Sequence, residues 1–140
     1  MQFIVNAEPR GKMRPKFSTK GGFARGYQSK KDKEWENSIR KAFLNAGGEK
    51  IDGFCSINIK ATFRIPKSYS KKKKEQIINH NEPFLKTPDV DNIMKSVLDA
   101  LNGVAYDDDK QVVMAKCSKS YALDENPHLE VLIYENDTFL

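Results

Sequence analysis

Cysteine, histidine and long apolar segments are scarce in this sequence. Its 140 residues include two cysteines and two histidines. Cys55 and Cys117 lack the paired spacing of a thiolate metal site, so we expect both to be buried free thiols in a reducing cytosol. His80 and His128 are isolated from other ligand-type residues, and we expect them on the surface or in loops.

No apolar run approaches the roughly 20 residues that a membrane-spanning helix needs, and no secretory signal pattern is present. We therefore expect a cytoplasmic protein with no membrane partner. With 39% hydrophobic and 31% charged residues, the chain is expected to form one domain over residues 1–140 with a core of its own.

Charge is unevenly distributed along the chain. The net charge is +5, but residues 1–50 carry +7 and residues 86–111 carry −3. A basic half beside a compact acidic centre is typical of a protein that cleaves phosphodiesters, since cations hold the polyanion and carboxylates hold a metal. Positive charge alone is equally compatible with a basic protein that binds no nucleic acid.

The acidic centre lies between Pro88 and Gln111 and contains six aspartates. A helix is expected from about Asp91 to a left-handed cap at residues 102–103. Its apolar stripe consists of Ile93, Val97, Leu98 and Leu101. On the other face, Asp91, Lys95 and Asp99 follow one another at steps of four residues.

Two further acidic segments flank this helix. Asp89 precedes it in an extended stretch, where it can converge with Asp91, and the triplet of residues 107–109 follows on the return loop. Grouped carboxylates repel one another unless a cation holds them, and Mg²⁺ commonly binds one or two carboxylates together with waters or phosphate.

Simpler interpretations of the same residues stay open. Asp-x-Asp pairs are common at helix starts, and aspartate runs are common in solvated turns. A calcium-binding loop is excluded, because the position that requires glycine is occupied by Met94 or Val112.

The remaining pattern predicts an α/β (α+β) fold with a small mixed β-sheet and about three helices. Strands are expected over residues 1–6, 55–65, 112–121 and 128–134. A helix is expected from Ser29 to about Ala46, and a short one after Ser68 or Ser70. Residues 9–27 are expected to form a loop or hairpin.

Two basic segments are candidates for contact with nucleic-acid phosphates. They are Arg10, Lys12, Arg14 and Lys16 in the N-terminal segment, and Lys71, Lys72, Lys73 and Lys74 at the start of the short helix. Four lysines at a helix N-terminus oppose the macrodipole, and a feature that costs local stability invites a functional interpretation. The alternative is that both segments are simply solvated.

These residues resemble a known signature. The acidic centre has the pattern Asp89-x-Asp91-Asn92-x-x-Lys95-x-x-x-Asp99-Ala100-Leu101, followed by Asp108-Asp109-x-Gln111. It resembles the RusA-type Holliday-junction resolvases, which are small phage- and prophage-encoded endonucleases. The early segment Pro9-x-Gly11-Lys12-x-Arg14-Pro15 also resembles that family, so the similarity extends over nearly the whole chain.

The resemblance implies an Mg²⁺-dependent endodeoxyribonuclease, with Mn²⁺ as a possible substitute and no small-molecule cofactor. Its substrate would be branched DNA, a four-way junction resolved by paired symmetric nicks in recombination and repair, and the protein would be a homodimer. Asp89, Asp91 and Asp109 would bind the metal, with Asp108 as the alternative third ligand. Lys95 would contact the phosphate, whereas the role of Asp99 stays open.

Two other functions remain: a non-catalytic branched-DNA-binding protein, and a related metal-dependent nuclease acting on flaps or forks.

Overall fold

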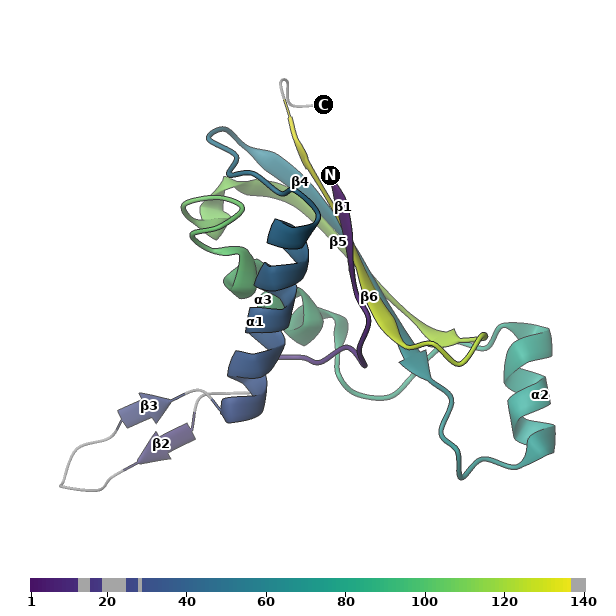
Figure 1. Cartoon of the computed structure of the whole chain (residues 1–140). Coiled ribbons are helices and arrows are strands. Elements are labelled where there is room, and N and C mark those ends of the chain that lie inside the picture. The colour runs from purple at the N-terminus through teal and green to yellow at the C-terminus, as the bar shows by residue number, and fades with distance from the viewer. Residues whose placement is uncertain (13–15, 19–24, 28, 137–140) are drawn as a thin grey trace.

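A mixed β-sheet with two helices on one of its faces forms the body of the protein (Figure 1). The computed structural model describes residues 1–12, 16–18, 25–27 and 29–136. The strands are β1 (Gln2–Val5), β2 (Lys16–Ser18), β3 (Arg25–Tyr27), β4 (Cys55–Arg64), β5 (Val112–Ala122) and β6 (His128–Glu135). The helices are α1 (Lys30–Asn45), α2 (Lys71–His80) and α3 (Val90–Leu101), with a short 3-10 helix, η2 (Asp109–Gln111).

The main sheet has the strand order β1-β6-β4-β5. Strands β4 and β5 are parallel, and the other neighbours are antiparallel. A parallel pair needs a crossover, and α2 and α3 both lie in the connection from β4 to β5. Within the described residues, this sheet and three α-helices confirm the predicted α+β class.

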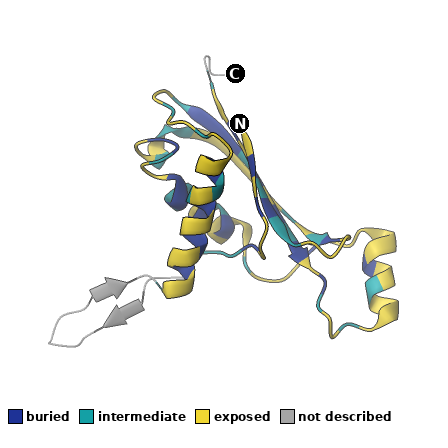
Figure 2. Cartoon of the chain, viewed as in Figure 1, coloured by how far each residue is buried: buried dark blue, intermediate teal, exposed yellow. Residues whose placement is uncertain are grey.

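Strand β4 is the centre of the core. Its odd-numbered residues from Cys55 to Phe63 are buried, as the alternation in the sequence predicts. In register, Ile59 lies opposite Val131 of β6 and Cys117 of β5. Helices α1 and α3 cover this face, and the buried side of each is dark blue in Figure 2.

Helix α1 begins after the predicted Ser29 cap, whose hydroxyl accepts a hydrogen bond from the Asp32 N–H. It buries Trp35, Ile39 and Phe43. The chain then turns at Gly47, which has a φ of +84°.

Helix α3 buries most of the expected stripe, with Ile93, Val97 and Leu101 fully inaccessible. A buried hydrogen bond fastens it to α1: the Trp35 indole N–H donates to the Ser96 hydroxyl at 3.2 Å. That hydroxyl also lies 3.1 Å from the carbonyl oxygen of Arg10. Three segments distant in the sequence therefore meet at one serine.

Helix α2 stands beyond the end of the sheet (Figure 1). Ser70 caps it by accepting from the Lys73 N–H, which decides between the two predicted starting serines. Only Ile77 of this helix is buried.

At the other extreme of the molecule, β2 and β3 pair antiparallel and form a hairpin, one of the two forms expected for residues 9–27. Arg14 lies outside the described residues.

Both cysteines are free thiols, and neither forms a disulfide. Cys55 is buried as expected, whereas Cys117 is only half-buried. Burial raises the pKa of both thiols, so both stay protonated at neutral pH. Among the helices of the described chain, none combines the length and apolar character needed to span a bilayer.

Candidate active site on helix α3

The start of α3 presents two exposed carboxylates. Asp89 is the N-cap residue, with extended backbone geometry and a carbonyl oxygen that accepts from the Ile93 N–H at 3.1 Å. Its carboxylate makes no capping hydrogen bond, although capping is the usual reason for an aspartate there. Asp91 follows in the first turn, also exposed. Both carboxylates are therefore accessible to a ligand.

The predicted charged row continues along the same helix. The Lys95 ammonium lies 3.5 Å from Asp99 Oδ2, one turn further on. The Lys95 side chain is 63% exposed, whereas that of Asp99 is 21% exposed. Lys95 can therefore reach a bound molecule, while Asp99 lies closer to the protein body.

After α3 ends, residues 103–109 fold back and run beside this helix. Gly103, with a φ of +83°, makes the turn, and the Tyr106 hydroxyl donates to the Leu98 carbonyl oxygen at 2.7 Å. Tyr106 is fully buried, and burial raises its pKa so that the phenol remains a donor. This contact brings the aspartate triplet beside the second half of α3.

Gln111 holds the triplet in place. Its side-chain oxygen accepts from the backbone N–H of Asp107 at 2.9 Å and of Asp108 at 3.3 Å. Its amide donates to the carbonyl oxygens of Ile51 and Gly53, at 2.9 and 2.8 Å. The glutamine of the sequence signature is thus a structural latch: its side chain joins the triplet to the segment before β4. The polar residues around it in the sequence do not reveal this role.

The three aspartates of the triplet differ in their contacts. The Asp107 carboxylate pairs with the Lys50 ammonium at 2.6 Å, and Asp108 caps η2 by accepting from the Lys110 N–H at 2.8 Å. Asp109 is half-buried, and burial, followed by the charges of Asp108 and Asp99, raises its pKa. A carboxylate with a raised pKa beside other acids is one that a cation would stabilise.

This donor set fits a hard divalent cation. Within the described residues, no three histidine, cysteine or acidic side chains come close enough together to hold an ion unaided. Mg²⁺ does not require a closed cage, because waters and substrate phosphate complete its shell. The uncapped Asp89, the exposed Asp91 and the pKa-shifted Asp109 are oxygen donors of the type that this ion prefers.

A groove adjoins the two exposed carboxylates. Its volume is about 960 Å³, and its lining includes Arg10, Lys12, Asp89 and Asp91. Two of the predicted DNA-binding residues and two predicted metal ligands therefore share one hollow.

The N-terminal basic residues are nevertheless engaged inside the protein. The Arg10 guanidinium lies 3.3 Å from the Asp32 carboxylate of α1. The Lys12 ammonium lies 2.9 Å from both Glu36 Oε1 and Asp99 Oδ2. Burial alone would lower the pKa of Lys12, but these two carboxylates outweigh it and the pKa is raised. Sequence reasoning missed these ion pairs, because their partners are remote in the chain.

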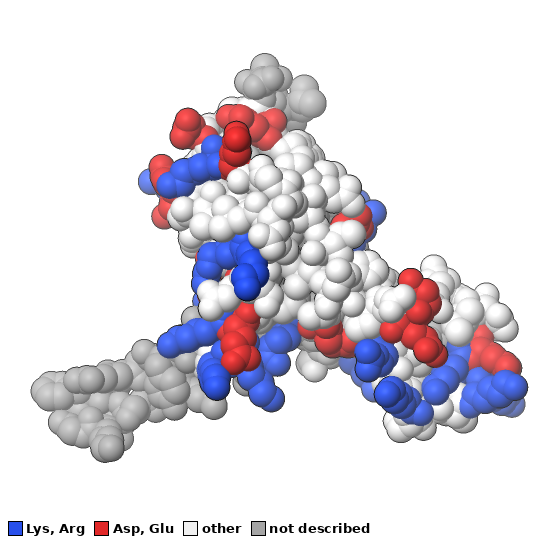
Figure 3. Space-filling view, viewed as in Figure 1, with Lys and Arg blue, Asp and Glu red and all other residues white. Residues whose placement is uncertain are grey.

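The other predicted basic segment lies apart from this groove. Lys71 to Lys74 form the first turn of α2, and the Lys73 ammonium sits 3.9 Å from the centre of the Tyr69 ring. Figure 3 shows Lys and Arg side chains gathered over α2 and near the start of α1, along one edge of the molecule. Lys16 lies in β2.

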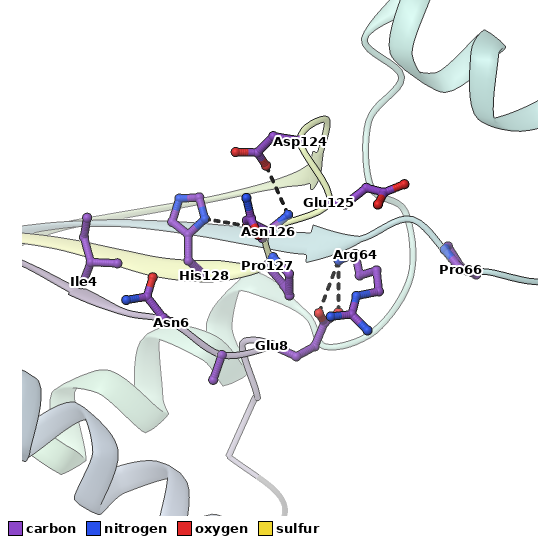
Figure 4. A pocket seen from close by; sticks show the side chains of 11 residues that line it. Ile4, Asn6, Glu8, Arg64, Pro66, Asp124, Glu125, Asn126, Pro127 and His128 are labelled. Carbon is purple, nitrogen blue, oxygen red and sulfur yellow. Dashed lines mark hydrogen bonds between the residues drawn. The ribbon is translucent and has the colours of Figure 1, made fainter.

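Further hollows lie between the groove and α2. One of about 920 Å³ lies where β1, the end of β4 and the β5–β6 turn meet (Figure 4). Its lining has mixed charge, and the Glu8 carboxylate accepts from the Arg64 backbone N–H at 3.2 Å. Glu8 also lines the α3 groove, and Arg64 also lines a smaller hollow of about 290 Å³ that includes Lys67 and Lys74. The hollows thus adjoin one another through shared residues.

Gly11 permits the close approach of the N-terminal segment to α3. A Cβ atom on this residue would lie 2.8 Å from Pro88 Cβ and 2.9 Å from Asn92 Cβ. The next residue, Lys12, donates its backbone N–H to the Asn92 carbonyl oxygen at 2.9 Å. The glycine of the Pro9-x-Gly11-Lys12 pattern thus has a steric role beside the site.

The comparisons with known proteins cover almost the entire chain. Residues 6–134 match the family model described as Endodeoxyribonuclease RusA. The chain is also similar to the uncharacterized protein YqaN of Bacillus subtilis (strain 168), with 37% identity over 138 residues and 96% of each chain covered.

Replacement of Gly11 by alanine should disturb the start of α3. The added methyl would overlap two neighbouring Cβ atoms, so the N-terminal segment must move away from the helix. We expect a decrease of about 1–3 kcal/mol in the free energy of unfolding, measured by urea denaturation. Gly53→Ala is the control, because its added Cβ would meet only a Glu135 side-chain oxygen at 3.3 Å. Equal stability of both variants would contradict the steric role.

Proposed function

The chain belongs to the RusA family of endodeoxyribonucleases, and on that basis we propose that it resolves Holliday junctions with Mg²⁺ by paired symmetric nicks in DNA recombination and repair. Members of this family hydrolyse phosphodiester bonds in Holliday junctions and generally depend on a divalent metal. The observation that carries the proposal is the row of Asp91, Lys95 and Asp99 on α3, with the accessible Asp89 before it and Asp109 returning beside it.

Asp89, Asp91 and Asp109 would hold the metal. Asp109 is preferred to Asp108 because the latter already accepts a hydrogen bond as the cap of η2. When bound, the cation would supply an activated water and neutralise charge on the phosphoryl group. The protein's own contribution is to place these carboxylates around the cation.

Lys95 would stabilise the transition state. Its ammonium is largely exposed and lies one helical turn beyond Asp91. From this position it could donate to the non-bridging oxygens of the scissile phosphate, where negative charge increases during the reaction.

The partner proposed for the chain is a second copy of itself, bound to a four-way junction. Such a junction has two-fold symmetry, and each chain offers one row of catalytic groups. Symmetric cutting of two strands therefore needs two related sites.

The lysines of α2 would contact an arm of the junction. The hollows that adjoin one another from the α3 groove to Lys67 and Lys74 support this assignment, as does the exposure of Lys71, Lys72 and Lys73. Arg10 and Lys12 have less freedom to bind phosphate, because carboxylates of the protein already hold them.

The first test is cleavage of a mobile four-way junction in Mg²⁺ by the wild-type protein and by Asp91→Asn. We expect paired symmetric nicks from the wild type, and a decrease of at least about 100-fold in rate with junction binding retained in the variant. Flap and fork substrates serve as controls. Equal cutting of flaps and junctions would indicate a less selective nuclease, and binding without cutting, even with Mn²⁺, would indicate a non-catalytic binder.

The triplet provides an internally matched pair of variants. Asp109→Asn should abolish cutting, because it removes a metal ligand. For the same reason it should abolish the rise in melting temperature that we expect Mg²⁺ to produce in the wild type. Asp107→Asn should retain both, because that carboxylate pairs with Lys50 at the surface. Nicking assays and thermal unfolding with and without Mg²⁺ measure the two effects. The reverse result would assign the third ligand to Asp107.

Neutralising α2 should weaken the salt dependence of junction binding. Replacement of Lys71, Lys72 and Lys74 by glutamine should reduce the slope of log affinity against log salt by about 0.9 for each phosphate that the helix no longer neutralises. Fluorescence anisotropy over a range of about 50 to 200 mM salt measures this slope. Lys41→Gln, at an exposed position of α1, is the control for the loss of one surface charge away from α2. An unchanged slope would leave the α2 lysines as solvated residues.

A further inference from the structure

One carboxylate oxygen of Asp99 is shared by two ammonium groups. Lys12 Nζ lies 2.9 Å from Asp99 Oδ2, and Lys95 Nζ lies 3.5 Å from the same atom. The two lysines differ in accessibility, since the Lys12 side chain is 20% exposed and that of Lys95 is 63% exposed. The shorter contact is thus made by the lysine that is held inside the protein.

Lys12 is anchored from several directions. Its ammonium also lies 2.9 Å from Glu36 Oε1 of α1, and its backbone N–H donates to the Asn92 carbonyl oxygen. The adjoining Gly11 packs against the start of α3. Its charge is secure, because both carboxylates raise its pKa above the ordinary value. Lys12 therefore supplies a fixed positive charge rather than a mobile side chain.

The position of Asp99 creates a competition for Lys95. Asp91 lies four residues before Lys95 and Asp99 lies four residues after it, so the lysine can lean toward either end of the row. Without Lys12, the partly buried Asp99 carboxylate would attract the exposed, flexible ammonium of Lys95 more strongly. Lys95 would then be drawn away from the groove beside Asp91.

We propose that Lys12 is a positioning residue: it neutralises Asp99 and thereby leaves Lys95 available to the scissile phosphate. The inference rests on the proposed role of Lys95 and assigns Lys12 to the organisation of the site instead of to phosphate binding. It also gives Asp99 a function, as the carboxylate through which Lys12 and Lys95 are coupled.

The decisive comparison uses Lys12→Met, alone and combined with Asp99→Asn. In single-turnover nicking at saturating protein, Lys12→Met should lower the rate by about 10-fold or more while junction affinity changes less than about 2-fold. Adding Asp99→Asn should restore the rate to within about 3-fold of wild type, because the competing carboxylate is gone. In a Lys95→Ala background, Lys12→Met should cause no further decrease.

A second measurement does not depend on cutting. The rate at which acetic anhydride acetylates Lys95, followed by mass spectrometry, should fall in Lys12→Met and recover in the double variant. This separates the two hypotheses: an inactive wild type would contradict the proposed function, whereas an unchanged acetylation rate would contradict the coupling of Lys12 to Lys95. Lys41→Met, an exposed lysine of α1, is the matched control.

Other outcomes would also overturn the inference. If Lys12→Met weakens junction binding and reduces the salt slope by about one unit, with the saturated nicking rate unchanged, Lys12 is a phosphate contact. If Lys12→Met does not fold, the variant that combines it with Asp99→Asn is compared with wild type directly. That variant removes a positive and a negative charge together, so neither Lys12 nor Asp99 leaves the other unpaired. Nicking near the wild-type rate supports the positioning role, and a rate as low as that of Lys95→Ala refutes it.

Discussion

The ion pairs of Lys12 with Glu36 and Asp99 are the interaction on which the site depends. They join the N-terminal segment, α1 and α3, which are far apart in the sequence. All three charges are largely shielded from water, so removal of one partner would leave another uncompensated. The hydrogen bonds through Ser96 fasten the same three segments on the apolar side of the contact. The row of Asp91, Lys95 and Asp99 is thus carried by a helix that is fixed on both faces.

A second constraint fixes the position of the acidic return loop. Tyr106 ties the loop to the backbone of α3, and Gln111 ties it to the segment before β4. These contacts use neutral groups, so they do not compete with the carboxylates for a cation. They leave Asp109 near Asp99 and Lys95, where its raised pKa reflects burial together with the concentration of negative charge. Metal binding would relieve that repulsion.

The basic residues that precede the acidic centre have two physical roles. Some of these residues form ion pairs within the protein: Arg10 and Lys12 neutralise buried acidic residues of α1. The remainder, represented by the first turn of α2, faces solvent and is free to meet a polyanion. Net charge alone could not separate these roles, because it counts an internal ion pair and a solvated lysine equally. Only the burial of the acidic partners distinguishes them.

The sequence by itself determined most of the helices and strands and supplied the residues of the candidate site. The alternation in β4, the Ser29 cap and the steps of four in α3 each follow from local spacing, which a single chain reveals directly. Tertiary structure decided what those residues contact. It paired Lys12 with Asp99 and made Gln111 a latch, because such contacts depend on how segments fold back over 60 or more residues. Local pattern sets secondary structure, whereas long-range packing sets the partners of each charge.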